Sequence, residues 1–245
     1  LVASLGDGKF VVYLQSKVSM TDGRLVGAEA LVRYRDDELG IISPARFIQG
    51  FEDSGLIRHV DLFVFEWVCQ VVERWEGEGH AVPVSFNFSR RTLLENDLVT
   101  SMESIVSRHD LSRSNLEIEI TESFAAIGKS VLFRAANDLL SAGFTLSLDD
   151  FGTKYTDLSI LSSIDFSMIK LDKSLIESVV DDATKQTVLK HIIGMCDELR
   201  VDVIAEGVES TDQERVLRGL GCRKGQGYLY SRPIPLEDFE QRFLR

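Results

Sequence analysis

The feature that most limits the fold of this chain is a regular alternation of short strand-like segments with helical segments. Eight segments have the apolar, β-rich composition of strands, and from the third onward a helical segment separates each from the next. The strand-like segments cover residues 10–18, 24–33, 82–88, 116–121, 145–149, 166–171, 201–205 and 225–230. The helical segments cover residues 44–53, 56–75, 92–109, 131–141, 157–163, 183–199, 211–220 and 236–244. Alternating strands and helices imply a parallel sheet, so this pattern in 245 residues predicts a single α/β domain, a closed (β/α)8 barrel.

The start of the chain departs from this repeat. Met20-Thr21-Asp22-Gly23 separates the first two strand-like segments, and Asp-Gly between two such segments predicts a tight hairpin. We therefore expect one early strand to be antiparallel to its neighbour. An open doubly wound sheet is the alternative, but the chain has no GxGxxG motif after its first strand and no P-loop.

Composition narrows the class of protein. A formal net charge of -12 and a pI near 4.8 argue against broad electrostatic binding to a nucleic acid polymer. Cys69, Cys196 and Cys222 form no CxxC motif, so we expect reduced, buried thiols in a cytoplasmic protein. The most apolar stretch, residues 60–72, is too short to span a bilayer, and we expect no membrane contact by this domain. Because the first methionine is Met20, we expect residues 1–245 to be one domain of a longer protein.

Polar side chains mark the predicted strand ends, where chemistry is located in barrels of this kind. These residues are Glu29, Asn87, Glu119, Asp149 with Asp150, Lys170, Glu206 and Gln226. Each has an ordinary explanation by itself: one of the two aspartates as a helix cap and the other as a solvated residue, Glu119 as part of an exposed alternation with Glu117, or Lys170 as a surface lysine. Together they are harder to explain, because several carboxylates in one barrel mouth repel each other unless bound cations compensate.

The donor types indicate which cation would suit this mouth. The set is all oxygen with one amide and contains no histidine or cysteine, which favours Mg²⁺ or Mn²⁺ over Zn²⁺. Adjacent carboxylates at Asp149 and Asp150 allow one to bridge two ions, an arrangement used for in-line phosphoester hydrolysis. Lys170 would then orient or stabilise an attacking hydroxide. A magnesium barrel enzyme of the enolase kind, with Lys170 abstracting a proton, is another possibility.

Seven short motifs, in chain order, resemble the EAL-domain family. They are Glu29-Ala30-Leu31, Asn87-Phe88-Ser89, Glu119-Ile120-Thr121-Glu122, Asp149-Asp150-Phe151-Gly152-Thr153, Ile169-Lys170-Leu171-Asp172, Ala205-Glu206-Gly207-Val208-Glu209 and Gln226-Gly227-Tyr228. Any one of these tripeptides would be weak evidence, but seven in order are highly specific. The similarity runs from about Phe10 to Pro233, nearly the whole chain.

This resemblance implies a modified TIM barrel that hydrolyses cyclic di-GMP to linear pGpG with two Mg²⁺ or Mn²⁺ ions. By motif, it implies Glu29, Asn87, Glu119 and Asp149 as ligands of one metal, and Asp149, Asp150 and Glu206 as ligands of the second. It places Lys170 and Gln226 at the catalytic water or its shell, and Gln15, Leu31 and Arg33 at the cyclic di-GMP. It gives Glu122 the role of stabilising the loop after the two aspartates. The resemblance also implies a bacterial signalling protein with N-terminal sensor or regulatory domains, and a homodimer.

One segment departs from the family's pattern. Active members usually continue after Asp-Asp-Phe-Gly-Thr with glycine, an aromatic residue and two small residues, whereas this chain reads Lys154-Tyr155-Thr156-Asp157. Asp157 adds negative charge where a small hydroxyl would have met Glu122. Two functions therefore stay open: a metal-dependent cyclic di-GMP phosphodiesterase, which we favour, and a catalytically weak or silent cyclic di-GMP receptor.

Overall fold

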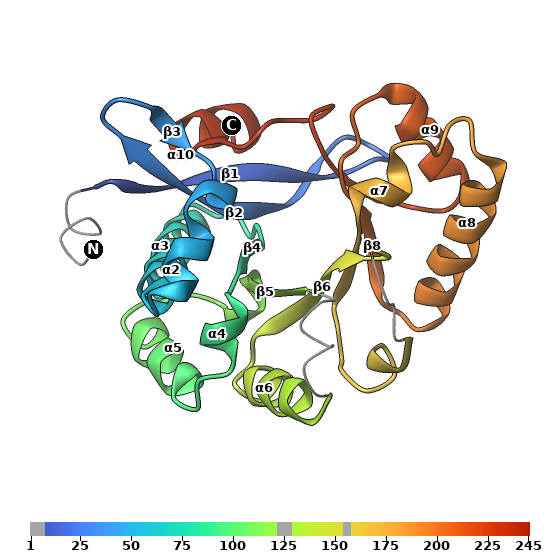
Figure 1. The fold of residues 1–245 in the computed structure, drawn as a ribbon. Coiled ribbons are helices and arrows are strands. Elements are labelled where there is room, and N and C mark those ends of the chain that lie inside the picture. Colours follow the sequence, from blue (N-terminus) through green and yellow to red (C-terminus); the bar gives the residue numbers. More distant parts are fainter. Residues whose placement is uncertain (1–7, 122–128, 154–157) are drawn as a thin grey trace.

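The computed structural model describes residues 8–121, 129–153 and 158–245, and its strands close into an eight-stranded barrel (Figure 1). The barrel strands, in spatial order, are β1 (Phe10–Ser19), β2 (Leu25–Asp36), β4 (Val84–Asn87), β5 (Leu116–Thr121), β6 (Thr145–Phe151), β7 (Met168–Leu171), β8 (Asp202–Ala205) and β9 (Lys224–Gln226). β9 pairs with β1 and completes the circle. The predicted barrel is confirmed.

Strand β1 is the antiparallel member of the barrel. It runs antiparallel to both of its barrel neighbours, β2 and β9, whereas the pairs from β2 and β4 through to β8 and β9 are parallel. The cause is the predicted hairpin, in which Gly23 has a φ of +72° and Ser19 donates its backbone N–H to Arg24 O at 2.8 Å. A tight turn reverses the chain, so β1 cannot be parallel to β2.

Two short strands lie outside the barrel circle and were not predicted. β3 (Gly40–Ile42) pairs antiparallel with the end of β2, and β10 (Ile234–Pro235) pairs antiparallel with β1. Both lie in stretches between the expected segments, residues 34–43 and 231–235, for which neither a strand nor a helix is expected. Strands of two or three residues are too short to show an alternating pattern, so periodicity cannot detect them.

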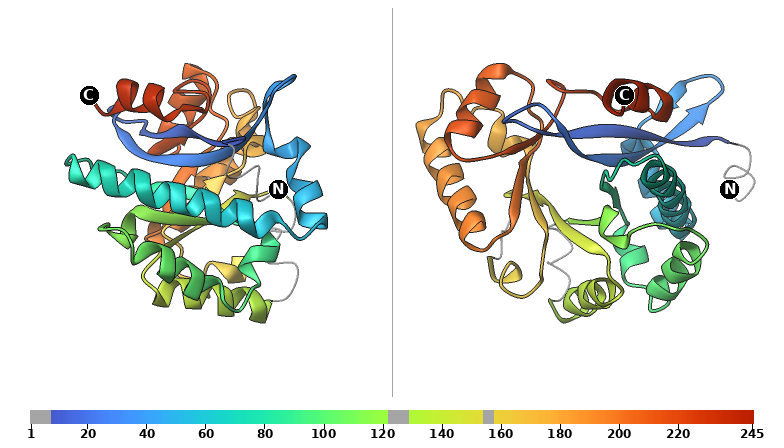
Figure 2. Two further views of the ribbon diagram at one scale, coloured as in Figure 1. Left: turned by 90° about the vertical axis from the view of Figure 1, so that its left-hand side faces the viewer. Right: turned by 180° about the vertical axis from the view of Figure 1, so that it is seen from behind.

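Helices surround the barrel (Figure 2). They are α2 (Ile48–Asp53), α3 (Ile57–Gly77), α4 (Arg90–Leu93), α5 (Leu98–Val106), α6 (Lys129–Ser141), α7 (Lys173–Ile176), α8 (Ala183–Glu198), α9 (Thr211–Gly219) and α10 (Leu236–Phe243), with 3-10 turns at Pro44–Arg46, Arg113–Asn115 and Leu158–Ile160. No helix in the part of the chain that the structure describes combines the length and apolarity needed to cross a membrane. The three cysteines are free and buried, as predicted.

Two helix predictions need correction. Residues 92–109 form two helices, α4 and α5, because Ser89 caps the first and Asp97 begins the second, and polar side chains of this kind favour turns over helix interiors. In the expected helix at residues 157–163, the described part contains only the 3-10 turn Leu158–Ile160. The last barrel strand is also shorter than expected and ends at Gln226 instead of starting near it.

The apolar core lies between the strands and the helices. Phe86 of β4 packs against Phe65 of α3 with ring centroids 5.3 Å apart, and neither side chain is exposed. Leu146 and Ile169 are likewise fully buried. Successive side chains on a strand point to opposite faces, so a continuous outer core leaves the inner face free for polar residues.

Candidate functional site

The ammonium group of Lys170 lies at the centre of the barrel mouth. Its side chain, on β7, is 1% exposed. Its Nζ contacts one carboxylate oxygen each of Glu119 at 2.6 Å, Glu206 at 2.8 Å, Asp149 at 3.1 Å and Glu29 at 3.5 Å. The four acids belong to β5, the end of β8, β6 and β2. The barrel therefore gathers the predicted strand-end residues, and the surface interpretation of Lys170 is wrong.

Amide side chains hold Glu29 from two directions. Asn87 donates Nδ2–H to Glu29 Oε1 at 3.3 Å and to Glu119 Oε2 at 3.0 Å. Gln226 donates Nε2–H to Glu29 Oε2 and, at 3.2 Å, to Gln15 Oε1. Turning the Asn87 amide over would present Oδ1 toward an ion instead. Asn87, Glu119, Gln226 and Gln15, four of the predicted site residues, are thus part of one hydrogen-bonded group around Glu29.

A distortion of β6 brings the two adjacent aspartates to the same place. Neighbouring strand residues normally face opposite sides, but the β6–β7 register shifts between Leu148 and Phe151, and Asp150 has a φ of +57°. Asp149, Asp150 and Glu206 consequently each offer an oxygen within 4.8 Å of the others. Three carboxylate oxygens at this spacing fit a hard divalent cation such as Mg²⁺ or Mn²⁺.

Burial controls the protonation of most of these acids. Burial, reinforced by the neighbouring Glu119 carboxylate, raises the pKa of Glu29 to about 8. Burial likewise raises the pKa of Glu206 to about 7, and it raises the pKa values of Asp149 and Asp150. At neutral pH without a divalent cation the mouth therefore retains protons, which a bound metal ion would displace.

The two buried lysines have the opposite effect on their partners. Burial alone would raise the pKa of Glu119, but the ammonium groups of Lys170 and Lys17 outweigh it and hold this pKa at about 2. Burial would lower the pKa of Lys170, yet the surrounding carboxylates, Glu119 and Glu206 first among them, keep it well above its usual value. In the metal-free domain these contacts favour the ammonium form of Lys170, which argues against proton abstraction of the enolase kind.

A hollow of about 310 Å³ opens above this cluster. Gln15, Glu29, Leu31 and Tyr228 are among the residues that line it. Asn87 and Glu119 do not line it. Arg33, the third expected ligand-contacting residue, lies outside this lining: its guanidinium is 5.9 Å from the Tyr13 ring centroid and donates to Val32 O at 2.8 Å. Glu122, Lys154 and Asp157 lie outside the described residues.

Comparison with known proteins agrees with this geometry. The sequence model of the EAL domain matches residues 1–233. The chain belongs to the EAL domain family. Signaling protein YkoW of Bacillus subtilis is 32% identical over 238 residues, which are 97% of this chain and 30% of that protein. Bifunctional diguanylate cyclase/cyclic di-GMP phosphodiesterase MucR of Pseudomonas aeruginosa is 32% identical over 230 residues, which are 94% of this chain and 34% of that protein.

A solved structure provides the same result for the fold. The PaMucR phosphodiesterase in its c-di-GMP complex superposes on this EAL domain with a TM-score of 0.92 at 31% identity, covering 97% of each chain. The present chain spans about a third of the length of the two curated relatives, 30% and 34%.

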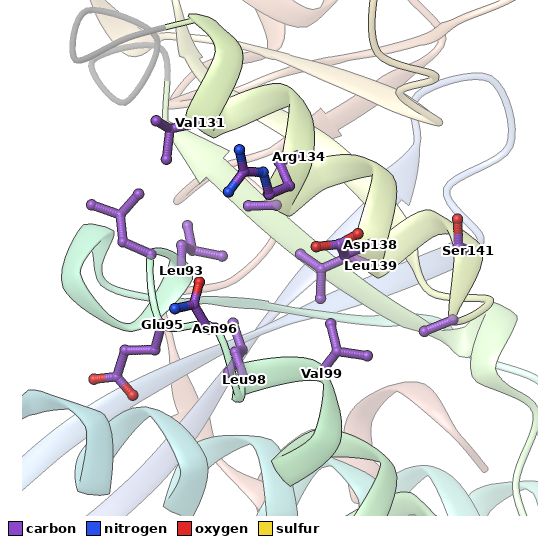
Figure 3. A pocket seen from close by; sticks show the side chains of 13 residues that line it. Leu93, Glu95, Asn96, Leu98, Val99, Val131, Arg134, Asp138, Leu139 and Ser141 are labelled. Carbon is purple, nitrogen blue, oxygen red and sulfur yellow. The ribbon is translucent and has the colours of Figure 1, made fainter.

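The EAL domain has a second hollow, whose lining contains none of the mouth residues (Figure 3). This groove of about 410 Å³ lies between the α4–α5 region and α6, and Leu93, Val131 and Arg134 are among its lining residues. None of the described residues that line it is one of the predicted site residues. It is therefore separate from the candidate site.

Sequence reasoning missed one component of the barrel interior. Lys17 is 3% exposed, and its Nζ lies 2.7 Å from Glu117 Oε1 and 3.2 Å from Glu119 Oε1. The exposed alternation considered for Glu117 and Glu119 is wrong, because these residues are only 6% and 1% exposed. A signal was present: Lys17 follows Gln15 by two positions, so the two side chains share a strand face.

Proposed function

We propose that this EAL domain hydrolyses cyclic di-GMP to linear pGpG with two divalent cations, Mg²⁺ or Mn²⁺. The observation that carries the proposal is the set of carboxylates at the barrel mouth, in which Asp149, Asp150 and Glu206 bring their oxygens within 4.8 Å of one another. Membership of the EAL domain family and the cyclic di-GMP phosphodiesterase activity named for the relative MucR support it.

The acids and amides of the mouth would hold the cations. Glu29, Asn87, Glu119 and Asp149 are the proposed ligands of one ion, with Asp149 shared by a second ion at Asp150 and Glu206. When bound, such a pair of cations activates water and neutralises charge on the attacked phosphodiester. The spread of ligands over β2, β4, β5, β6 and the end of β8 lets the rigid barrel fix their positions.

Lys170 and Gln226 would act on the water instead of on the metal. Lys170 is fully buried, and the surrounding carboxylates raise its pKa, which favours an ammonium group that can stabilise a hydroxide. Gln226 is anchored through its amide to Glu29 and Gln15, which orients its remaining carbonyl oxygen. We therefore assign Lys170 to stabilising the hydroxide and Gln226 to orienting the water.

The substrate would occupy the hollow above the cluster. Gln15 and Leu31 line this hollow, and Arg33 follows on the same face of β2. Arg33 suits a phosphate oxygen because its guanidinium is forked and always charged. Reaching the hollow would require Arg33 to leave its contact with Val32 O.

The decisive experiment is incubation of the domain with cyclic di-GMP and Mn²⁺, followed by chromatography of the products. We expect pGpG in the presence of Mn²⁺ or Mg²⁺ and none after addition of EDTA. Absence of pGpG at high enzyme concentration and saturating Mn²⁺ would overturn the proposal.

A receptor without turnover is the second candidate, favoured by the sequence departure at Lys154 and Asp157. It predicts tight cyclic di-GMP binding with negligible hydrolysis. Lys154→Gly combined with Asp157→Ser should then raise the rate of pGpG formation. An unchanged rate in the double variant would argue against the receptor interpretation.

Assembly stays a prediction. We propose that the domain forms a homodimer and belongs, in the bacterial cytoplasm, to a longer signalling protein with regulatory domains. Light scattering of the purified domain tests the dimer directly, and a monomeric mass at micromolar concentration would contradict it.

A further inference from the structure

We infer that Lys17 is a positioning residue for the metal site, because it fixes the orientation of the carboxylate of Glu119, a proposed metal ligand. The inference rests on the proposed function, because it assigns Glu119 to a metal. It concerns a residue that none of the EAL motifs contains.

The two oxygens of Glu119 have different partners. Oε1 is 3.2 Å from Lys17 Nζ. Oε2 accepts from Lys170 Nζ at 2.6 Å and from Asn87 Nδ2 at 3.0 Å. Because Lys17 and the Lys170–Asn87 pair hold opposite oxygens, the carboxylate cannot rotate about its terminal bond without losing a charged hydrogen bond. Oε2 is thereby kept facing the other acids of the mouth.

Lys17 reaches Glu119 across the barrel. It belongs to the antiparallel strand β1, whereas Glu117 and Glu119 belong to β5, which is separated from β1 by β2 and β4. The long, flexible lysine stem allows this reach. The β1–β2 hairpin thus supplies a cation to the base of the site, in addition to Gln15 at its rim.

Glu117 anchors the lysine. The side chains of Lys17, Glu117 and Glu119 are 3%, 8% and 0% exposed, and Lys17 Nζ is closer to Glu117, at 2.7 Å, than to Glu119. Removing Lys17 would leave two buried carboxylates without the cation that they share. Their repulsion would turn Glu119 away from its present orientation.

The first variant is Lys17→Met, which keeps the approximate length of the side chain and removes its charge. We expect its Mn²⁺ dissociation constant to rise roughly 10- to 100-fold, the usual consequence of removing a partner that orients a metal ligand. Electron paramagnetic resonance of free Mn²⁺ measures this without any turnover. The rate of pGpG formation at a fixed subsaturating Mn²⁺ concentration should fall in parallel.

A double variant distinguishes two roles of Lys17: orienting the Glu119 carboxylate and neutralising the charge of Glu117. Lys17→Met with Glu117→Met removes both members of the buried pair, and apolar replacements of similar volume are often tolerated. We expect its thermal unfolding temperature to recover toward wild type, while its Mn²⁺ affinity stays low. If the double variant recovers Mn²⁺ affinity as well, Lys17 merely neutralises Glu117 and the inference is overturned. This variant also decides the matter if Lys17→Met alone fails to fold.

The matched control is Lys224→Met. Lys224 Nζ lies 2.6 Å from Asp202 Oδ2. Lys224 also lines a cavity of about 190 Å³ that Lys17 and Glu117 line too. Its Mn²⁺ affinity should equal that of wild type. Equal Mn²⁺ binding by wild type and Lys17→Met would overturn the inference and leave the proposed function intact. Conversely, Mn²⁺ binding by wild type without pGpG formation would sink the proposed hydrolysis alone.

Discussion

The inner and outer faces of the barrel differ in what they contain. Among the residues that the structure describes, the buried charged side chains are Lys17, Glu29, Asp61, Glu117, Glu119, Asp149 and Lys170. All of these except Asp61 belong to barrel strands and to one connected group of ion pairs or hydrogen bonds. The outer face is a layer of fully buried apolar side chains such as Leu146 and Ile169.

The outer face of the barrel therefore supplies most of the folding stability, and the inner face holds the groups proposed for the chemistry. Apolar burial outside the barrel provides the main driving force for folding, at roughly 25 cal/mol per Å². Inside the barrel, buried acids have raised pKa values, which means that their charged forms are destabilised there. Substitutions on the inner face should therefore change turnover or metal binding more than stability, and substitutions on the outer face should do the reverse.

The largest expected effect is on turnover, from Glu29→Ala. It removes a proposed metal ligand, so the rate of cyclic di-GMP hydrolysis should fall by roughly 10⁴-fold, or about 5 kcal/mol of transition-state stabilisation. Its unfolding free energy should change little, because burial already disfavours the Glu29 carboxylate. Product chromatography and urea unfolding measure the two quantities. Glu29→Gln, which retains the side-chain volume, is the control. Turnover near wild type in either variant would contradict the assignment of the chemistry to the inner face.

The next effect is on stability, from Phe65→Ala on α3. This fully buried ring packs against Phe86, Phe88 and Phe144, so truncation should lower the unfolding free energy by about 3–5 kcal/mol. Turnover per folded molecule should remain within a few-fold of wild type. Val188→Ala, at a position that is 47% exposed, is the control and should change stability by less than about 0.5 kcal/mol.

The same contrast explains which features could be predicted from the sequence. The barrel was predictable because its outer face requires apolar residues at strand and helix spacing, and those spacings are local. The polar mouth was predictable because a barrel brings strand ends together, so Glu29, Asn87 and Glu206 could be grouped before any coordinates were known. The EAL motifs added roles for these residues, and the roles stay predictions.

The features that could not be predicted depend on long-range geometry. Lys17 meets Glu117 and Glu119 only because β1 and β5 face each other across the barrel, and no local pattern records that distance. The convergence of Asp149 and Asp150 needs the register shift in β6 and the positive φ of Asp150. Both features arise when the barrel closes.

Asp61 is the exception to the contrast, since it is a buried acid on α3 that accepts from the backbone N–H of Ser89 at 3.0 Å. Burial raises its pKa from 3.8 to about 6. The folded state then holds this proton more tightly than the unfolded state, so stability is fully present below pH 3.8 and is lost as pH rises through 6. Relative to wild type, Asp61→Asn should gain about 2 kcal/mol of unfolding free energy between pH 4 and pH 7.

Urea unfolding of both proteins at several pH values measures this difference. Other groups titrate in both proteins, so the comparison cancels them. A constant difference between Asp61→Asn and wild type across this pH range would show that Asp61 is not protonated in the folded state.

The smallest expected effect is the pH dependence of metal binding at the inner face. Without a divalent cation, Glu29 and Glu206 have pKa values of about 8 and about 7, so at pH 6 both hold protons that an ion must displace. Raising the pH to 8.5 removes these protons in advance, and the Mn²⁺ affinity should increase by roughly tenfold or more. Titrations followed by electron paramagnetic resonance measure the affinity at each pH. The surface variant Val188→Ala, on α8, should show the same increase, because its substitution leaves the inner face unchanged. An affinity that stays constant or falls over this range would mean that these acids are already charged in the metal-free domain at pH 6. Their pKa values would then be close to those of exposed acids, in spite of their burial.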